Sequence, residues 1–93
     1  ARALNEQRVE ARRMLEAATA ALEADADLLT AGELSDIRAA LDVLGTAASG
    51  SDRRAIMVEL ERVNRITEPF AARRMDRSIH RALTGKKLED MKI

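Results

Sequence analysis

Hydrophobic residues recur at helical spacing along most of the chain. In the first segment they are separated by three, four or seven positions, at Leu4, Ala11, Leu15, Ala18, Leu22 and Leu29. Such spacing places them on one face of a helix, so a long helix is predicted over residues 3–29. The period-two alternation typical of strands is missing from the sequence, and the fold class is therefore predicted to be all-α.

A second helix is predicted over residues 31–48, and both of its ends carry local signals. Thr30 and Glu33 have the spacing of a capping box, in which each side chain accepts a hydrogen bond from the other residue's amide. Gly50 is expected to end the helix in a left-handed conformation. The apolar face predicted between these ends consists of Leu34, Ile37, Leu41, Leu44 and Ala48.

A third helix is predicted over residues 52–66, with Ser51 or Asp52 as its N-cap. Pro69 follows shortly afterwards. Inside a helix, Pro69 would remove the hydrogen bond to the Arg65 carbonyl and clash with it, at a cost of about 3 kcal/mol. We therefore expect this helix to end before the proline.

A fourth helix is predicted over residues 68–84, because a proline is tolerated in the first turn of a helix capped by Thr67. One long kinked helix is the alternative. Gly85 is expected to end the fourth helix, which leaves 86–93 as a flexible C-terminal tail.

The short connections between these segments predict an antiparallel up-down bundle of three to four helices over residues 1–85. At 27 residues, the first helix would be longer than its neighbours and would overhang them. Val9 and Met14 lie off its main apolar stripe, beside charged residues. Such a partly apolar edge is typical of a partner-binding surface, although scattered apolar residues are also common on protein surfaces.

The 93 residues carry 16 basic and 16 acidic side chains, so no net charge attracts nucleic acid or anionic lipid. Arg73, Arg77 and Arg81 form a stripe with a spacing of four, but Asp76 interrupts it and the chain has no Tyr or Trp for base stacking. Nucleic-acid binding is disfavoured, and the arginines are interpreted as a solvated outer face. The inward face of this helix is predicted to consist of Phe70, Met75, Ile79 and Leu83.

Catalytic and metal chemistry find little support in the sequence. The chain has no cysteine, and His80 is its single histidine. Metal sites need several such ligands, and nucleophilic catalysis needs a nucleophile beside a base. The four glycines are isolated and form no phosphate-binding loop. We therefore expect no enzyme activity, no cofactor and no metal, and the apolar runs are too short to span a membrane.

Two stretches, "EQRVEARRMLEAATAALEADADLLTAGELSDI" and "FAARRMDRSIHRALTGKKLEDM", resemble the C-terminal end of the seventy-kilodalton heat-shock chaperone family. The second stretch is similar to its bacterial heat-shock-cognate A branch, which is dedicated to iron–sulfur cluster assembly. The resemblance covers nearly the whole chain, which also lacks an initiator Met and is interpreted as a fragment of a longer protein.

This resemblance implies a helical lid that covers peptide held in a β-sandwich domain of the same parent chain, under the control of a separate ATPase domain. The lid contact is assigned by position to Arg13, Met14, Leu15 and Glu16. The implied client is the iron–sulfur scaffold protein, with a J-type co-chaperone, in the cytoplasm. ATP would bind the parent protein and not this segment.

A stand-alone interaction module is the alternative function, in which two copies form a homodimer through the overhang of the first helix. A basic bundle that binds nucleic acid is a further, weaker alternative.

Overall fold

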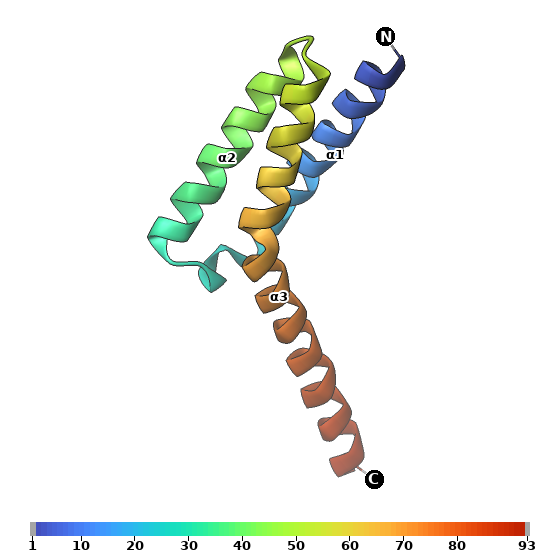
Figure 1. The fold of residues 1–93 in the computed structure, drawn as a ribbon. Helices are drawn as coiled ribbons and strands as arrows, with labels where there is room; N and C mark the ends of the chain where they lie inside the picture. The colour runs from blue at the N-terminus through green and yellow to red at the C-terminus, as the bar shows by residue number, and fades with distance from the viewer. Residues whose placement is uncertain (1, 93) are drawn as a thin grey trace.

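The computed structural model describes the backbone of residues 2–92 and the side chains of residues 2–84. Three α-helices and one 3-10 turn make up the fold, in the order α1 (Arg2–Asp25), η1 (Ala26–Leu28), α2 (Ala31–Ser49) and α3 (Arg53–Lys92). The helices alternate in direction, and α3 continues well past the other two (Figure 1). The prediction of an all-α helical bundle is confirmed.

The first helix ends earlier than the sequence predicted. Instead of reaching Leu29, α1 stops at Asp25, and the chain turns through η1, where the Leu29 amide donates to the Ala26 carbonyl at 3.0 Å. Aspartate is a weak helix former. Asp25 and Asp27 are also held by arginines of α3, a tertiary contact that the local pattern does not contain.

The start of α2 agrees with the prediction in detail. Thr30 accepts a hydrogen bond from the Glu33 amide at 3.1 Å, and the Glu33 carboxylate accepts one from the Thr30 amide at 2.9 Å. At the other end, the prediction of a left-handed Gly50 is wrong, since its φ is −87° and its ψ is −170°. The Gly50 amide still caps the helix by donating to the Ala47 carbonyl, and the chain leaves in an extended conformation.

Asp52 is the N-cap of α3, because its carboxylate accepts from the amides of Arg54 and Ala55 at 3.0 and 3.2 Å. The predicted break between residues 66 and 68 is wrong: α3 continues through Pro69. The Thr67 hydroxyl does not cap a new helix but donates back to the Val63 carbonyl at 2.7 Å.

Burial of Phe70 explains why the helix is not interrupted. Phe70 and Val63 are seven residues apart, or two helical turns, and both are buried on the same face. A break between them would destroy this register. The cost of the proline is therefore offset by tertiary contacts on both sides of it, and α3 bends near its middle (Figure 1).

Gly85 does not end the last helix either, because α3 runs to Lys92. Glycine in a helix interior costs only about 1 kcal/mol relative to alanine, so a single glycine is a weak stop signal. The predicted flexible tail 86–93 falls on residues whose side chains lie outside the described part of the chain.

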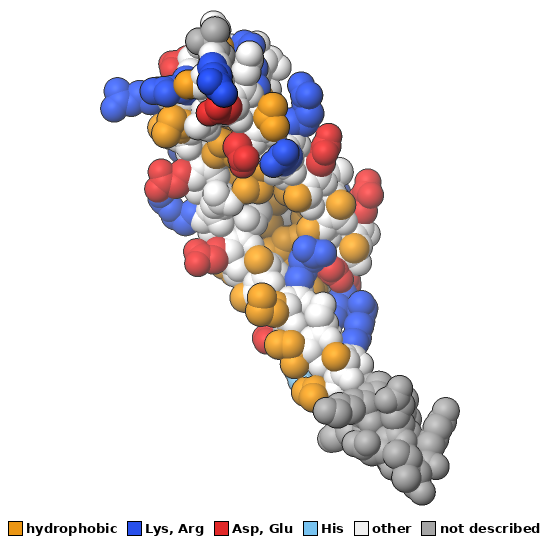
Figure 2. All heavy atoms as spheres, turned by 90° about the vertical axis from the view of Figure 1, so that its right-hand side faces the viewer, with side chains coloured by type: hydrophobic (Ala, Val, Ile, Leu, Met, Phe, Trp, Pro, Cys, Tyr) orange, Lys and Arg blue, Asp and Glu red, His pale blue; other side chains and the backbone are white. Residues whose placement is uncertain are grey.

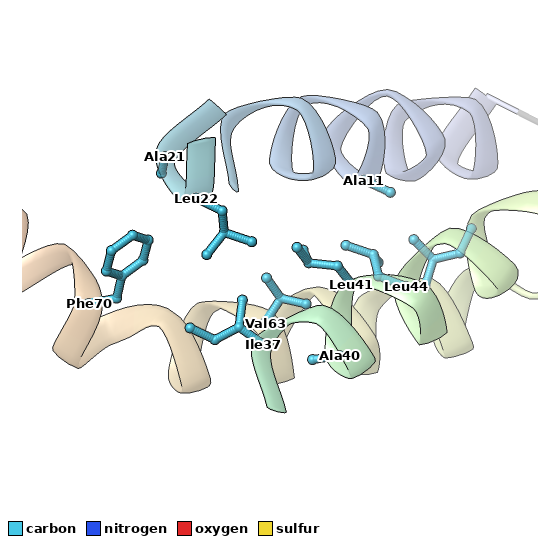
Figure 3. Packing of buried hydrophobic residues seen from close by; sticks show 10 residues of the cluster. Ala11, Ala21, Leu22, Ile37, Ala40, Leu41, Leu44, Val63 and Phe70 are labelled. Atoms are coloured by element: carbon cyan, nitrogen blue, oxygen red, sulfur yellow. The ribbon is translucent and has the colours of Figure 1, made fainter. Parts of the chain in front are cut away.

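The hydrophobic core lies between the three helices, and its buried side chains point toward one another (Figure 3). Leu44, Ile56 and Val63 are its largest fully buried side chains. The complete buried set is Ala11, Ala21, Leu22, Ile37, Ala40, Leu41, Leu44, Ile56, Val63 and Phe70. Five of the predicted apolar positions on α1 and α2, together with Phe70 of α3, are among these ten, so the helical pattern located more than half of the core.

The prediction for the inward face of the last helix is correct for Phe70 and wrong for the three residues after it. Phe70 is 3% exposed, whereas Met75, Ile79 and Leu83 are 66%, 49% and 54% exposed. Arg73 and Arg77, which were expected to face solvent, bind Glu33, Asp25 and Asp27 instead, whereas Arg81 is exposed as predicted. Helical spacing identified two faces of this segment and could not decide which of them the bundle covers.

The molecule is elongated, with extents of 60 × 31 × 17 Å. At 24 residues, α1 is longer than α2 with 19, and Arg8 of α1 donates to the Gly50 carbonyl at 2.7 Å near the α2–α3 turn. The first residues of α1 thus extend only slightly beyond that turn. The longer projection is made by distal α3, the name used below for residues 70–92 (Figure 1).

Candidate functional site: an arginine clamp beside an apolar groove

The four residues assigned to the lid contact lie on α1 but not on one face. Arg13 and Glu16 are exposed, and Arg13 lies 3.9 Å from Glu10. Met14 and Leu15 are half-buried and pack against the core. The structure therefore offers the two charged side chains to a partner, whereas the two apolar ones already contribute to the bundle.

Met14 and Leu15 also face different grooves. Leu15 borders a groove between α1 and α2, and Met14 borders one of about 150 Å³ between α1 and α3. We call the second one the apolar groove. Its lining is Met14, Ala17, Ala18, Ala21, Leu22, Ile37, Thr67, Phe70, Ala71 and Arg74. Figure 2 shows hydrophobic side chains around a hollow on this side of the molecule and further ones along the projecting part of α3.

Ion pairs near this groove join α3 to the end of α1, to η1 and to the first turn of α2. Arg73 binds Glu33 through two hydrogen bonds of 2.8 and 2.9 Å, and it also donates to the Leu28 carbonyl at 3.0 Å. Paired hydrogen bonds between a guanidinium and a carboxylate fix both distance and orientation. Glu33 therefore caps α2 and anchors α3 at the same time.

Two further arginines bind the aspartates at the end of α1. Arg74 donates to Asp25 at 2.8 Å, and Arg77 donates to Asp25 and to Asp27, each at 3.0 Å. The Arg74 guanidinium also lies 5.8 Å from the centre of the Phe70 ring, within reach of a cation–π interaction. We call this set of six charged residues the arginine clamp: Arg73, Arg74, Arg77, Asp25, Asp27 and Glu33.

The electrostatics of the clamp follow from these contacts. Hydrogen bonds from Arg73 and from the Thr30 amide lower the pKa of Glu33 to about 2. Hydrogen bonds from Arg74 and Arg77 likewise hold the pKa values of Asp25 and Asp27 below their ordinary range. The carboxylates thus stay ionised in all but strongly acidic solution.

Arg73 and Arg77 are paired with carboxylates of the same chain, so most of the arginine stripe is not free to bind phosphate groups. Arg77 is only 24% exposed at its side chain, and its partners are acidic. His80 is exposed on distal α3. Across the described residues, no three histidine or acidic side chains are grouped to hold a metal ion. In the same part of the chain, no helix is both long and apolar enough to span a bilayer.

Sequence reasoning missed the clamp because its partners are 40 to 52 positions apart. The signal that could have indicated it is the division of charge along the chain. Residues 1–50 carry five basic and nine acidic side chains, and residues 51–93 carry eleven basic and seven acidic ones. Opposite net charges in the two halves of a small bundle favour ion pairs between them.

The fold and the sequence comparisons together define a class of protein. The chain is similar over nearly its whole length to the C-terminal region of heat-shock chaperones, and its helical bundle fits the lid of such a protein. No family model matches the chain.

The relatives described next are HscA homologs, so the chain belongs to the HscA chaperones of the seventy-kilodalton heat-shock family. It is 52% identical over 90 residues to the chaperone protein HscA homolog of Azoarcus sp. (strain BH72), which covers 97% of this chain and 14% of the relative. The homolog of Herminiimonas arsenicoxydans is 50% identical over 91 residues, or 98% of this chain and 15% of the relative. That of Aromatoleum aromaticum is 47% identical over all 93 residues, which is 15% of its length. The chain thus spans about one seventh of the length of these relatives.

Proposed function

We propose that this chain is the lid of the peptide-binding region of a chaperone that assists iron–sulfur cluster assembly. In this role it covers a bound peptide of the scaffold protein, in the cytoplasm, and slows release of that peptide. Identity of 52% across 97% of the chain to an HscA homolog is the observation that carries the proposal. A helical module packed around one core, with exposed charged residues on α1, is suited to act as such a cover.

ATP hydrolysis and the response to a J-type co-chaperone belong, in this proposal, to a domain outside the chain. The chain itself has no catalytic role and binds no cofactor. Its direct partner is the β-sandwich of the same parent protein, which it contacts through the middle of α1.

The structure refines how that contact is tested. Met14 and Leu15 pack against the core, so their replacement also destabilises the bundle. Arg13 and Glu16 are exposed, and their replacement leaves the core intact. The informative variant is therefore Arg13→Ala with Glu16→Ala.

Peptide dissociation is measured in the intact parent chaperone carrying this double substitution. Faster release of a fluorescent scaffold peptide is expected, because the lid loses polar contacts to the domain beneath it. The matched control is Glu61→Ala with Arg62→Ala. Both residues are exposed on α3. Equal release rates for the two variants would show that the contact residues are wrong.

A deletion separates that outcome from failure of the lid role itself. Removal of all 93 residues from the parent is expected to accelerate peptide release more than the double substitution does. If the deletion leaves the dissociation rate unchanged, the chain is not a lid.

A further inference from the structure

The part of α3 that projects from the bundle carries exposed apolar side chains along one face. Met75, Ile79 and Leu83 follow one another at a spacing of four and are 66%, 49% and 54% exposed. Figure 2 shows hydrophobic side chains along this projection. We call these three residues the apolar stripe. Because the solvated face of a helix is normally polar, the stripe indicates a surface that another molecule covers.

Charge does not oppose contact between two copies of this segment. Arg73, Arg74 and Arg77 are paired with carboxylates of α2, α1 and η1. The other ionised side chains on the described residues of distal α3 are Asp76 and Arg81, which have opposite signs. The whole chain has no net charge at pH 7. Proteins without net charge associate more readily than strongly charged ones, so a second copy is an electrostatically acceptable partner.

The stripe is self-complementary under a twofold rotation. Met75 and Leu83 lie four residues before and four residues after Ile79. When two such helices run antiparallel with the axis at Ile79, the two Ile79 side chains meet, and each Met75 faces Leu83 of the other copy. A contact of this kind uses the same residues on both chains and closes on itself, so association stops at two copies.

Asp76 and His80 give the antiparallel arrangement a complementary polar edge. Both side chains are exposed, and they lie on the same side of the stripe because they are four positions apart. An antiparallel pair brings the same side of both helices together. Asp76 of one copy then lies beside His80 of the other, and the twofold axis repeats this contact. A carboxylate accepts a hydrogen bond from an imidazole N–H in either charge state of the histidine.

The described part of the bundle leaves room for a helix on the stripe. Further back along α3, the same face carries Glu61, Arg65 and Glu68, and all three are exposed. The contacts of α3 with the bundle lie on the opposite face, at Val63 and Phe70. A partner helix can therefore run along α3 past Met75 without meeting α1 or α2.

We propose that two copies of this chain associate through the apolar stripe, as an antiparallel pair of distal α3 segments with the twofold axis at Ile79. The surface lies on α3 and not at the start of α1, where the sequence suggested a homodimer contact. With about 15 described residues from each chain, the contact is smaller than a standard interface of roughly 1,200–2,000 Å², so the dimer is weak. It does not rest on the chaperone role.

Sedimentation velocity at chain concentrations up to about 1 mM measures the association. A concentration-dependent shift from monomer to dimer is expected. Ile79→Glu places two carboxylates together at the axis and is expected to raise the dissociation constant at least about 100-fold. The matched control is Val58→Glu, because Val58 is 52% exposed on the same helix and lies outside the contact. This control is expected to leave the constant unchanged, and circular dichroism establishes that both variants retain their helicity.

Cysteine cross-linking tests the register without adding charge. The chain contains no cysteine, so each substitution supplies its only thiol. Ile79→Cys is expected to form a disulfide-linked dimer in a glutathione redox buffer, since the axis places the two thiols together. Met75→Cys and Leu83→Cys are expected to cross-link faster when mixed than when each is alone. Val58→Cys is the control and is expected to stay reduced.

Four results would overturn the proposal. The first is a chain that stays monomeric up to about 1 mM. The second is a dimer that tolerates Ile79→Glu as well as it tolerates Val58→Glu, which would place the interface elsewhere. The third is an Ile79→Cys variant that cross-links no faster than Val58→Cys. The fourth is a Met75→Cys variant that cross-links to itself faster than to Leu83→Cys, which would show that the helices run parallel.

Discussion

Two valines on the same helix give a direct test of the packing. Val63 is fully buried among the three helices, and Val58, five residues earlier on α3, is 52% exposed. Replacing either one with alanine removes the same two methyl groups from the same element. A difference in their effects on the free energy of unfolding therefore measures burial alone.

The magnitude follows from the structure. Removing two buried carbons costs about 1.6 kcal/mol in lost transfer free energy, and the cavity left behind raises this to about 2–3 kcal/mol. Alanine is also the better helix former, by about 0.5 kcal/mol, at both sites. Val63→Ala is thus expected to destabilise by about 2 kcal/mol, and Val58→Ala is expected to be neutral or slightly stabilising.

Urea unfolding followed by circular dichroism is the assay. With a slope of about 1 kcal/mol per molar urea, typical of a small domain, the two midpoints should differ by about 2 M or more. Since a bundle of this size is stable by about 3–5 kcal/mol, the Val63 variant remains folded in water. Equal midpoints would refute the arrangement of α3 against α1 and α2.

Three further predictions concern the ends of the helices and the clamp. Thr30→Ala should lower the free energy of unfolding by about 1 kcal/mol, because it removes the cap of α2. Thr46→Ala loses only an exposed hydroxyl bond within the same helix and should lower it less, a difference that thermal unfolding measures. Gly50→Ala should be tolerated in the same assay, because φ is negative and the new Cβ would lie at van der Waals distance, 3.4 Å, from the Ala47 carbonyl oxygen. A loss of more than about 1 kcal/mol in the free energy of unfolding would indicate that Gly50 is left-handed. The pKa of Glu33 is lowered from 4.5 to about 2, so its stabilisation is complete above pH 4.5 and is lost as pH falls toward 2. Glu33→Gln keeps a capping acceptor and should flatten this acid dependence in urea midpoints measured across that range, whereas an unchanged dependence would contradict the assignment.

Local sequence was sufficient at the start of α2, where the deciding contacts are local. The two partners of the capping box, Thr30 and Glu33, are three positions apart, so both can be identified from the local sequence. The core positions of α2 follow one helical face, because a helix in a small bundle has one side to bury. For the same reason the cap of α3 could be narrowed to Ser51 or Asp52, and the structure shows that it is Asp52, whose two bonds reach only two and three residues ahead.

The candidate site could be predicted only in part. The resemblance placed the lid contact on α1, and the structure shows that two of its four residues, Met14 and Leu15, also pack against the core. The spacing of Arg73 and Arg77 was visible, but their acidic partners on the α1–α2 connection were not. Pairs separated by some 40 residues are set by how helices meet, which no window of sequence contains.

The sequence by itself determined the helical class, the N-cap of α2, most of the buried positions and the family. Tertiary structure alone decided that α3 continues through Pro69 and that Gly50 is extended. It also decided that distal α3 turns three arginines, Arg73, Arg74 and Arg77, toward the bundle and its apolar stripe outward. The physical reason is that helical periodicity defines two faces of a segment without ranking them. In this protein, ion pairs between the arginines of α3 and three carboxylates elsewhere in the chain decide which face of α3 meets the bundle.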